Sequence, residues 1–468
     1  MDTAKIDQIT LSINLQQAIG SEMANHFLIV PKSVSETEYV FYIDQTQELE
    51  LPSIKEELKL LFNKQISLEI VDSSIIKKAL SIYYRKNDSQ PKLVSYGNDF
   101  LEDLIFEAKH INASDIHIEI YEEDVRVRLR IDGQLIEKNN IKKESYLELI
   151  NQIKIKSNLD ITEKRLPQDG RIEYDDFDIR VSILPTHHGE KVVMRILGRD
   201  ASHLDIYQLG FEDHDLPLYL EAVKKTNGII LISGPTGSGK TTTLYGTLKH
   251  LNTVNTNIVT VEDPIEYTLK GINQVQLKEN IGLTFTSALR SFLRQDPDII
   301  MLGEIRDAQT AQMAIRASLT GHLVLSTIHT NSAIGTISRL VDMGVPSFLI
   351  AETINISVAQ RLIRTLCKTC KKEQEFNNDD LPISFNPIHK LNKHHIAVGC
   401  DECYHTGYKG RRAIYEILPI TSDVIDAIKK NTLEQSDIMK NRKLSDKAFE
   451  LFSKGITSLD EIYPILIN

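Results

Sequence analysis

The sequence predicts an α/β protein with several domains, and three observations support this class. The chain has 468 residues, which is too long for one ordinary hydrophobic core. From about residue 211 onward, apolar runs typical of strands alternate with segments typical of helices, as in a parallel sheet covered by helices. One of these runs, 228–233, leads directly into the pattern GxxxxGK[ST] and then into a helix-forming stretch.

The glycine-rich pattern is that of a phosphate-binding loop. Its glycines allow backbone N–H groups to surround phosphate oxygens, Lys240 adds a positive charge, and the Thr241 hydroxyl is suited to bind Mg²⁺. The strand before it and the helix after it are the context that this function requires. We therefore expect ATP and Mg²⁺ to bind at Gly234, Pro235, Thr236, Gly237, Ser238, Gly239, Lys240, Thr241 and Thr242.

The composition restricts the class of protein further. Apolar content of 41% and charged content of 25% are typical of a soluble globular chain. The net charge of −11 argues against a protein that coats nucleic acid, so no direct nucleic-acid partner is expected. No apolar stretch approaches the roughly 20 residues of a membrane helix, and the N-terminus lacks the pattern of a secretory signal. We expect a cytoplasmic protein that reaches a membrane only through partners.

Two polar segments divide the chain. Residues 84–99 contain a proline and turn formers and are typical of a linker, and residues 197–210 are interpreted as a second linker. Short apolar runs and helix-like stretches before the first linker predict a small α/β domain. The expected domains are therefore residues 1–90, 98–200 and 211–468.

Residues 122–133 alternate between apolar and charged side chains, which predicts a strand that ends in an Asp-Gly turn. Arg126, Arg128 and Arg130 share one face of this strand. A solvated basic face is the simpler interpretation. Contact of this face with a neighbouring subunit is the functional alternative.

Acidic residues close two apolar runs at the carboxyl end, where ligands bind in open parallel sheets. Glu304 is the candidate to orient or deprotonate an attacking water. Asp298 starts the same run, about 20 Å away, and is expected to be structural. Glu262 and Asp263 close the other run, where carboxylates could hold Mg²⁺ through water; an acid-rich turn without function is the alternative.

The segment GHLVLSTIHTN, residues 321–331, carries two histidines that are seven positions apart. His329 is at its carboxyl end and is placed to sense the γ-phosphate. His322 is at the entry end and is expected to be structural or coupled to an interface. Their odd separation puts them on opposite faces of a strand, so a shared metal ion is not expected.

The four cysteines of the chain form two CxxC pairs, Cys367 with Cys370 and Cys400 with Cys403. This spacing is typical of a tetrahedral thiolate zinc site, within an insert of about residues 364–413. A redox dithiol and coincidental buried cysteines are the alternatives, but a redox motif usually needs one pair. His405 is close in sequence and is expected to be a bystander.

Several segments together resemble one family. In chain order they are ASDIHIE, EKRLPQDGR, GPTGSGKTTTLY, VEDPIE, LRQDPDIIMLGEIRD, TGHLVLSTIHTN and AQRLIRTLC, together with the two CxxC pairs. In this combination they resemble the traffic ATPases of type II secretion and type IV pilus assembly. The resemblance covers roughly residues 95–420 densely and the N-terminal domain only loosely.

The resemblance implies a RecA-like ATPase domain preceded by a PAS-like domain and a small partner-docking domain, with the zinc hairpin inserted in the C-terminal domain. Six subunits would form a ring on the cytoplasmic side of an inner membrane, next to a platform protein and a membrane-anchored docking protein. ATP hydrolysis would rotate the domains and drive assembly of a pseudopilus or pilus. Arginines that reach the nucleotide from the second domain would fall among Arg165, Arg171 and Arg180.

The chain departs from the family pattern at three places, of which the change at Gln309 has little consequence. Gln309 replaces a more common acid, and the segment between Arg171 and Arg180 is short, which leaves the choice of arginine open. The N-terminal region lacks the Arg-Leu-Gly motif of relatives that bind cyclic di-GMP, so that ligand is not expected. Retraction ATPases generally lack the cysteine pairs, so assembly is favoured over disassembly.

Two other functions use some of the same motifs. A motor for DNA uptake or conjugation is one, but an acidic chain without a basic, aromatic-rich tract argues against direct DNA contact. The other is a nucleotide-binding scaffold that has lost hydrolysis. It would require a damaged site, whereas Lys240, Thr241, Glu262, Glu304 and His329 are all present.

Overall fold

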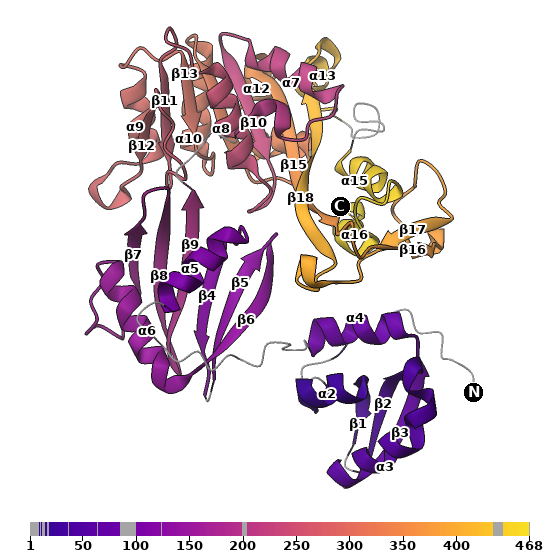
Figure 1. Cartoon of the computed structure of the whole chain (residues 1–468). Coiled ribbons are helices and arrows are strands. Elements are labelled where there is room, and N and C mark those ends of the chain that lie inside the picture. The colour runs from indigo at the N-terminus through magenta and orange to yellow at the C-terminus, as the bar shows by residue number, and fades with distance from the viewer. Residues whose placement is uncertain are drawn as a thin grey trace.

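The structure is a computed structural model. It describes residues 18–35, 37–62, 64–84, 100–122, 124–198, 204–433 and 443–467, together with residues 9, 11 and 15. These residues form three successive domains and a C-terminal extension (Figure 1). None of the helices in these ranges is long and apolar enough to cross a membrane.

The first domain is a three-stranded sheet with helices packed against it. The strand order is β1-β2-β3, with an antiparallel first pair and a parallel second pair. Phe41, Ile43 and Leu58 are fully buried in its core. The elements are α2 (Ser21–Phe27), β1 (Ile29–Val34), β2 (Glu38–Asp44), η1 (Gln45–Glu50), α3 (Leu51–Phe62), β3 (Gln65–Val71) and α4 (Ser73–Tyr83).

The second domain is a six-stranded antiparallel sheet of order β6-β5-β4-β9-β8-β7. Two helices pack on one face, and side chains of both belong to the same buried cluster as the sheet. The elements are α5 (Phe100–His110), β4 (Asp115–Ile120), β5 (Asp124–Ile131), β6 (Gln134–Lys142), α6 (Lys143–Lys156), β7 (Gln168–Glu173), β8 (Phe177–Thr186) and β9 (Gly189–Gly198).

The arginines of β5 are less solvated than the sequence pattern indicates. The strand and its turn form as expected, with Val125, Val127 and Leu129 buried. On the other face, Arg126 and Arg128 bind Glu119 of β4, and Arg130 lies 3.4 Å from Asp115. Antiparallel pairing places these acids beside the arginines, so the face is an ion-pair network rather than a free basic surface.

The third domain contains a seven-stranded sheet of order β12-β11-β13-β14-β10-β15-β18. Every neighbouring pair is parallel except β15 with β18, which confirms the predicted parallel α/β class. The strands are β10 (Gly228–Ser233), β11 (Ile258–Glu262), β12 (Asn273–Gln276), β13 (Ile299–Leu302), β14 (Leu323–Ile328), β15 (Ile354–Leu366) and β18 (Tyr408–Pro419).

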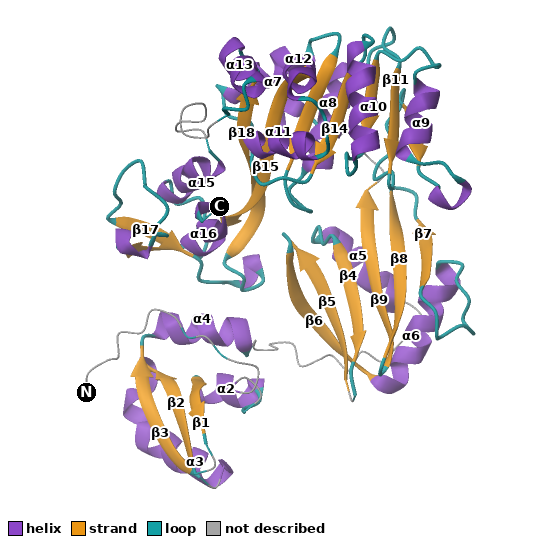
Figure 2. Ribbon diagram, turned by 180° about the vertical axis from the view of Figure 1, so that it is seen from behind, coloured by secondary structure: helices purple, strands orange, loops and turns teal. Residues whose placement is uncertain are grey.

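Helices cover both faces of this sheet (Figure 2). Residues of α7 and α8 pack on one face, and residues of α9 to α12 pack on the other. The helical elements are η2 (Ile206–Gln208), α7 (Asp215–Val223), α8 (Lys240–Leu251), η3 (Glu279–Ile281), α9 (Phe285–Phe292), α10 (Ala308–Leu319), α11 (Ala333–Asp342) and α12 (Ser347–Thr353).

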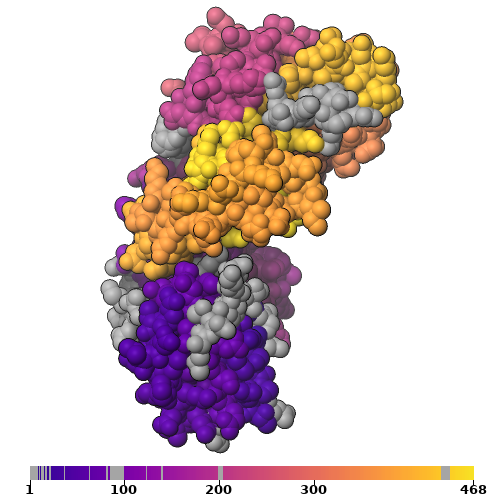
Figure 3. Space-filling view, turned by 90° about the vertical axis from the view of Figure 1, so that its right-hand side faces the viewer, coloured from indigo at the N-terminus to yellow at the C-terminus, as the bar shows by residue number. Residues whose placement is uncertain are grey.

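The C-terminal extension is built around the cysteine insert between β15 and β18. It lies beside the sheet in Figure 1 and above the first domain in Figure 3. Its elements are β16 (Lys372–Glu375), η4 (Asn378–Asp380), β17 (Lys393–Ile396), η5 (Asp401–Cys403), α15 (Leu444–Ser453) and α16 (Leu459–Leu466). The helix α13 (Ser422–Lys429) packs against α12 of the third domain.

The two expected linkers have different outcomes. Residues 85–99 lie outside the described part of the chain. In the second segment, β9 continues to Gly198, residues 199–203 lie outside the described part, and η2 follows.

Candidate functional site

The predicted phosphate-binding loop joins β10 to α8. All residues of β10 are buried, and the loop turns so that α8 begins at Lys240 with Gly239 as its N-cap. Gly234, Gly237 and Gly239 have positive φ angles of 148°, 79° and 87°, which glycine adopts at little cost. The loop therefore ends at a helix N-terminus, where backbone N–H groups and the helix dipole favour an anion.

Lys240 is held against this loop. Its Nζ donates to the carbonyl oxygens of Gly234 at 2.8 Å and Pro235 at 3.0 Å. Burial lowers the pKa of Lys240, and the charge of Glu304 acts in the opposite direction. The lysine is thus partly desolvated and close enough to Glu304 for the two charges to interact.

Gln360 of β15 supports the loop, a role that the sequence pattern did not reveal. Its Oε1 accepts a hydrogen bond of 2.9 Å from the buried Thr243 hydroxyl of α8. A Cβ atom on Gly239 would lie 2.8 Å from Gln360 Nε2, and one on Gly234 would lie 2.5 Å from the Gln360 carbonyl oxygen. Gln360 therefore leaves no space for side chains at these two loop positions.

Glu262 is buried at the carboxyl end of β11 and accepts three hydrogen bonds. Its Oε1 accepts from Thr260 Oγ1 at 2.6 Å and from Gln274 Nε2 at 3.1 Å, and its Oε2 accepts from the Tyr245 hydroxyl. These three bonds hold the acidic turn 262–266 against α8, since Tyr245 also accepts from the Glu266 backbone N–H. A carboxylate offers about four lone pairs, so these bonds leave one site on Glu262 for a further partner.

Glu304 and His329 meet at the same edge of the sheet. Glu304 follows the end of β13, and His329 directly follows β14. These strands are parallel neighbours, so their carboxyl ends meet, and Glu304 Oε2 lies 3.4 Å from His329 Nε2. The other carboxylate oxygen pairs with Arg306. A carboxylate, an imidazole and a guanidinium therefore converge at the edge of the sheet where β10, the strand before the phosphate loop, also ends.

Asp298 and His322 lie at the opposite ends of these strands. Asp298 Oδ2 accepts from the Asn257 backbone N–H at 2.7 Å, and His322 Nδ1 lies 2.9 Å from the Ala317 carbonyl oxygen. Both residues satisfy backbone groups where the strands begin. This placement agrees with the structural roles expected for them.

The three candidate arginines of the second domain have different surroundings. Arg180 donates to the Ile265 carbonyl and lies 3.8 Å from Glu266, so it reaches the acidic turn of its own chain. Arg171 pairs with Asp178 inside the second domain. Arg165 is 88% exposed and pairs only locally, with Glu163 at 3.4 Å.

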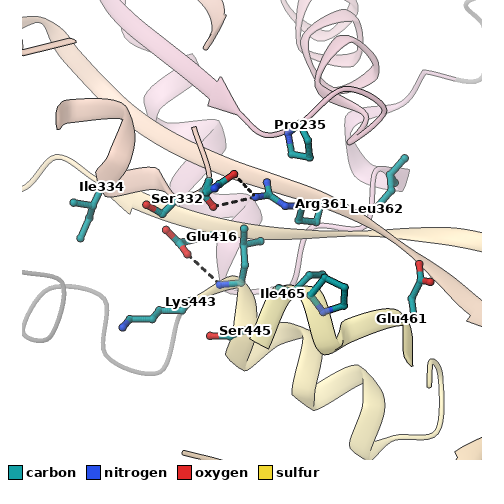
Figure 4. Close-up of a pocket in the computed structure, with 13 residues that line it drawn as sticks. Pro235, Ser332, Ile334, Arg361, Leu362, Glu416, Lys443, Ser445, Glu461 and Ile465 are labelled. Atoms are coloured by element: carbon teal, nitrogen blue, oxygen red, sulfur yellow. Dashed lines mark hydrogen bonds between the residues drawn. The ribbon is translucent and has the colours of Figure 1, made fainter. Parts of the chain in front are cut away.

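A cavity of about 580 Å³ lies beside the loop, lined in part by Pro235, Arg361 and Glu416 (Figure 4). Arg361 Nη2 donates to the Asn331 carbonyl at 3.3 Å and to its side chain at 3.2 Å. Glu416 accepts the first N–H groups of two helices, from Ala333 at 2.7 Å and Leu444 at 3.0 Å. Burial raises the pKa of Glu416. The segment after His329 is thereby linked to β15, β18 and α15.

The four cysteines converge at one point. Their sulfur atoms all lie within 4.8 Å of one another, and three of the pairs are 3.8 Å apart. A disulfide would need about 2.05 Å, whereas four sulfurs around Zn²⁺ at about 2.3 Å are separated by about 3.8 Å. Backbone N–H groups of Gly399 and Gly407 donate to Cys370 and Cys403. The donor set fits a structural zinc ion.

His405 is not part of this cluster. Its Nε2 lies 3.0 Å from Asp401 Oδ1, and the side chain is 55% exposed.

Known proteins resemble this chain over most of its length. The family model described as "Type II/IV secretion system protein" matches residues 94–464. The type IV pilus assembly ATPase PilB of Myxococcus xanthus is 46% identical over 374 residues, which are 77% of this chain and 66% of that protein. The type II secretion system protein E of Pseudomonas aeruginosa is 45% identical over 369 residues, or 77% of this chain and 73% of that protein.

Solved structures show the same fold. The pilus retraction motor PilT with bound ADP matches with a TM-score of 0.54 and 26% identity, over 77% of this chain and 94% of PilT. The Legionella pneumophila ATPase DotB matches with a TM-score of 0.58 and 22% identity, over 80% and 96% of the two chains. The chain thus spans about two thirds to three quarters of the two sequence relatives and nearly all of these two structures.

Proposed function

Because the chain belongs to the type II/IV secretion system protein family, we propose that it is an ATPase that drives assembly of a type II secretion pseudopilus or a type IV pilus. The relatives that match most of its length carry the names of these two activities. The observation that carries hydrolysis is the convergence of Glu304, His329 and Lys240 at the carboxyl edge of one sheet.

In this proposal the oxygen of a water molecule attacks the γ-phosphorus of ATP, and the bond to the bridging oxygen of ADP breaks. Glu304 accepts the proton of the water as general base. Lys240 and the loop N–H groups stabilise the charge on the phosphate oxygens. His329, at 3.4 Å from Glu304, orients that carboxylate and senses whether the γ-phosphate is present.

Two metal ions belong to the proposal. Mg²⁺ would be held by the Thr241 hydroxyl and, through water, by the acidic turn of Glu262 and Asp263, and it would neutralise charge on the phosphates. Zn²⁺ would be held by Cys367, Cys370, Cys400 and Cys403 and would stabilise the insert.

The proposed working unit is a homo-hexamer at the inner membrane, which it reaches through a platform protein and a docking protein. The exposure of Arg165 supports a role at a neighbouring subunit, since an arginine supplied in trans is a recurring device of such motors. The cysteine cluster supports assembly over retraction.

The test compares three variants in ATP binding and phosphate release. Lys240→Ala should lose nucleotide binding, whereas Glu304→Gln should keep ATP affinity while turnover falls at least ~10²-fold, as expected for a lost general base. Asp298→Asn is the matched control, because it alters the acid at the other end of the same segment and should keep turnover. Normal hydrolysis by Glu304→Gln would contradict the assigned role.

A further inference from the structure

The second domain contacts the third at two separate places. Arg180 of β8 reaches the acidic turn at Ile265 and Glu266, beside the nucleotide site. The turn between β5 and β6 reaches the base of the cysteine insert. The strand order β6-β5-β4-β9-β8-β7 separates these contacts across the sheet (Figure 1).

The contact at the insert is polar and specific. Asp132 Oδ2 accepts from the Gly410 backbone N–H at 2.7 Å, and Asp132 Oδ1 lies 3.6 Å from Arg411 Nε. Gln134 Oε1 accepts from Arg364 Nη1 at 2.9 Å. A cavity of about 380 Å³ lies next to these residues, so the contact is made by a few directed hydrogen bonds rather than by a packed apolar interface.

Arg364 joins the contact to the C-terminal helix. Its Nε donates to Glu461 Oε2 at 2.8 Å, and its backbone N–H donates to Glu461 Oε1 at 3.0 Å. The guanidinium carbon lies 4.2 Å from the centroid of the Tyr408 ring. Arg364 is therefore fixed on α16 and β18, which orients its remaining N–H groups toward Gln134.

The cysteine cluster fixes the other half of the contact surface. The segment 403–410 follows a tight path, in which Tyr404 and His405 have positive φ angles of 50° and 58°. Gly407 donates to Cys403 Sγ at 3.2 Å and accepts from the Cys367 backbone N–H at 2.9 Å. The local apolar cluster has three buried members, Leu366, Ala397 and Tyr408. Since so small a core contributes little, Gly410 is held by the pairing of Tyr408 and Arg411 with β15 on either side of it and, through Gly407, by the way the four sulfurs are held.

We propose that the base of the cysteine insert, formed by Arg364, Gly410 and Arg411, is a metal-supported docking surface for the turn 132–134 of the second domain. Metal binding at the four cysteines then holds the second domain against the third domain of the same chain. Release of this turn leaves the second domain free to pivot about its Arg180 contact, beside the nucleotide. The inference rests on the proposed function, because it assigns the zinc site a role in positioning the domain that carries the arginines.

The test uses the full chain and a variant altered only in the second domain, Asp132→Gly/Gln134→Ala. Asp132 has a φ angle of 49°, which glycine tolerates, so the turn itself should persist. Asp124→Ala is the matched control, because Asp124 is exposed at the other end of β5. Zinc content is measured first by elemental analysis and should be about one per chain.

Zinc affinity is then measured by competition with a chromogenic chelator. Coupling between two sites is reciprocal. If bound zinc strengthens the docking of the turn 132–134, then docking of this turn must strengthen zinc binding by the same factor. The double variant should bind zinc about three- to tenfold more weakly, the effect expected for losing about one net hydrogen-bond energy, and Asp124→Ala should match the parent chain. Hydrogen exchange of a peptide covering 129–137 should speed up when zinc is stripped from the parent, while the buried strand β4 stays unchanged.

A double variant with the zinc affinity of the parent chain would overturn the proposal. It would also be overturned if hydrogen exchange of the peptide 129–137 were the same with and without zinc, or if the chain bound no zinc. A chain that shows the zinc coupling but never hydrolyses ATP would instead contradict the proposed motor function. The two failures are therefore distinguishable.

Discussion

Arg165 and Arg180 should behave in opposite ways when variant chains are mixed. Arg180 contacts Ile265 and Glu266 of its own chain, which indicates action on the nucleotide of the same subunit. Arg165 is 88% exposed and pairs only with Glu163, which leaves it available to a neighbouring subunit. We therefore expect that Arg180 acts in cis and Arg165 in trans.

The expected recovery follows from counting sites. In an equal mixture of Arg165→Ala and Glu304→Gln chains, half of the chains keep Glu304, and half of their neighbours keep Arg165. About one quarter of the sites in mixed rings should therefore regain both groups. This recovery should be easy to detect, because a site without its arginine is slower by ~10³-fold or more. In the mixture of Arg180→Ala with Glu304→Gln, each chain still lacks one of its own groups, so activity should stay at background.

The assay is steady-state phosphate release after subunit exchange, with the parent chain mixed with Glu304→Gln as the reference that should give about half of full activity. Recovery in the Arg180→Ala mixture would refute action in cis. No recovery in the Arg165→Ala mixture, when the reference mixture behaves normally, would refute the assignment of Arg165 to a neighbour.

Two further predictions concern positioning and pH. Gln360→Leu removes the acceptor of the Thr243 hydroxyl and should weaken ATP binding about tenfold, because a buried hydrogen bond is lost, while kcat changes little. Thr243→Val should likewise weaken ATP binding and leave kcat nearly unchanged. A fall in kcat with unchanged ATP binding would contradict the supporting role of Gln360. Glu119 has its pKa lowered to about 2, because bonds from Arg128 and Lys191 outweigh the opposing effect of burial. A carboxylate whose pKa is lower in the folded state stabilises the fold at any pH above its ordinary pKa. This stabilisation is lost as the pH falls toward the pKa of the folded state, so the free energy of unfolding should fall by roughly 3 kcal/mol between about pH 4.5 and 2. Hydrogen exchange of β4 against pH tests this, and Glu119→Gln should lower stability at neutral pH and flatten the acid dependence; an unchanged profile would contradict the role of Glu119.

Local patterns in the sequence predicted the elements that position the site. The phosphate loop is one contiguous stretch with fixed chemistry, and Glu304 and His329 could be placed because parallel strands bring their carboxyl ends to one edge. Asp298 and His322 were assigned to the other edge by the same reasoning, and the structure places them there.

Contacts between distant segments were beyond such reasoning. Gln360 meets Thr243 from 117 positions away, and Asp132 meets Gly410 from 278 positions away; nothing in either local pattern specifies the partner. The pairing of Arg128 with Glu119 required the register of β4 against β5. Glu262 was placed at the correct edge, but its bonds to Thr260, Gln274 and Tyr245 depend on side chains from three elements.

The strand β15 connects the features that the sequence presented separately. Along its length it carries Gln360 beneath the phosphate loop, Arg361 bound to Asn331, and Arg364 at the docking surface, and Cys367 follows its last residue. The segment from Gln360 to Cys367 spans about 23 Å of extended chain, and antiparallel pairing with β18 stiffens nearly all of it. Because one paired strand holds both ends, displacement of the phosphate loop and displacement of the cysteine insert act on the same element. The segment AQRLIRTLC therefore joins the support of the phosphate loop, at Gln360, to the docking surface, at Arg364, within one strand.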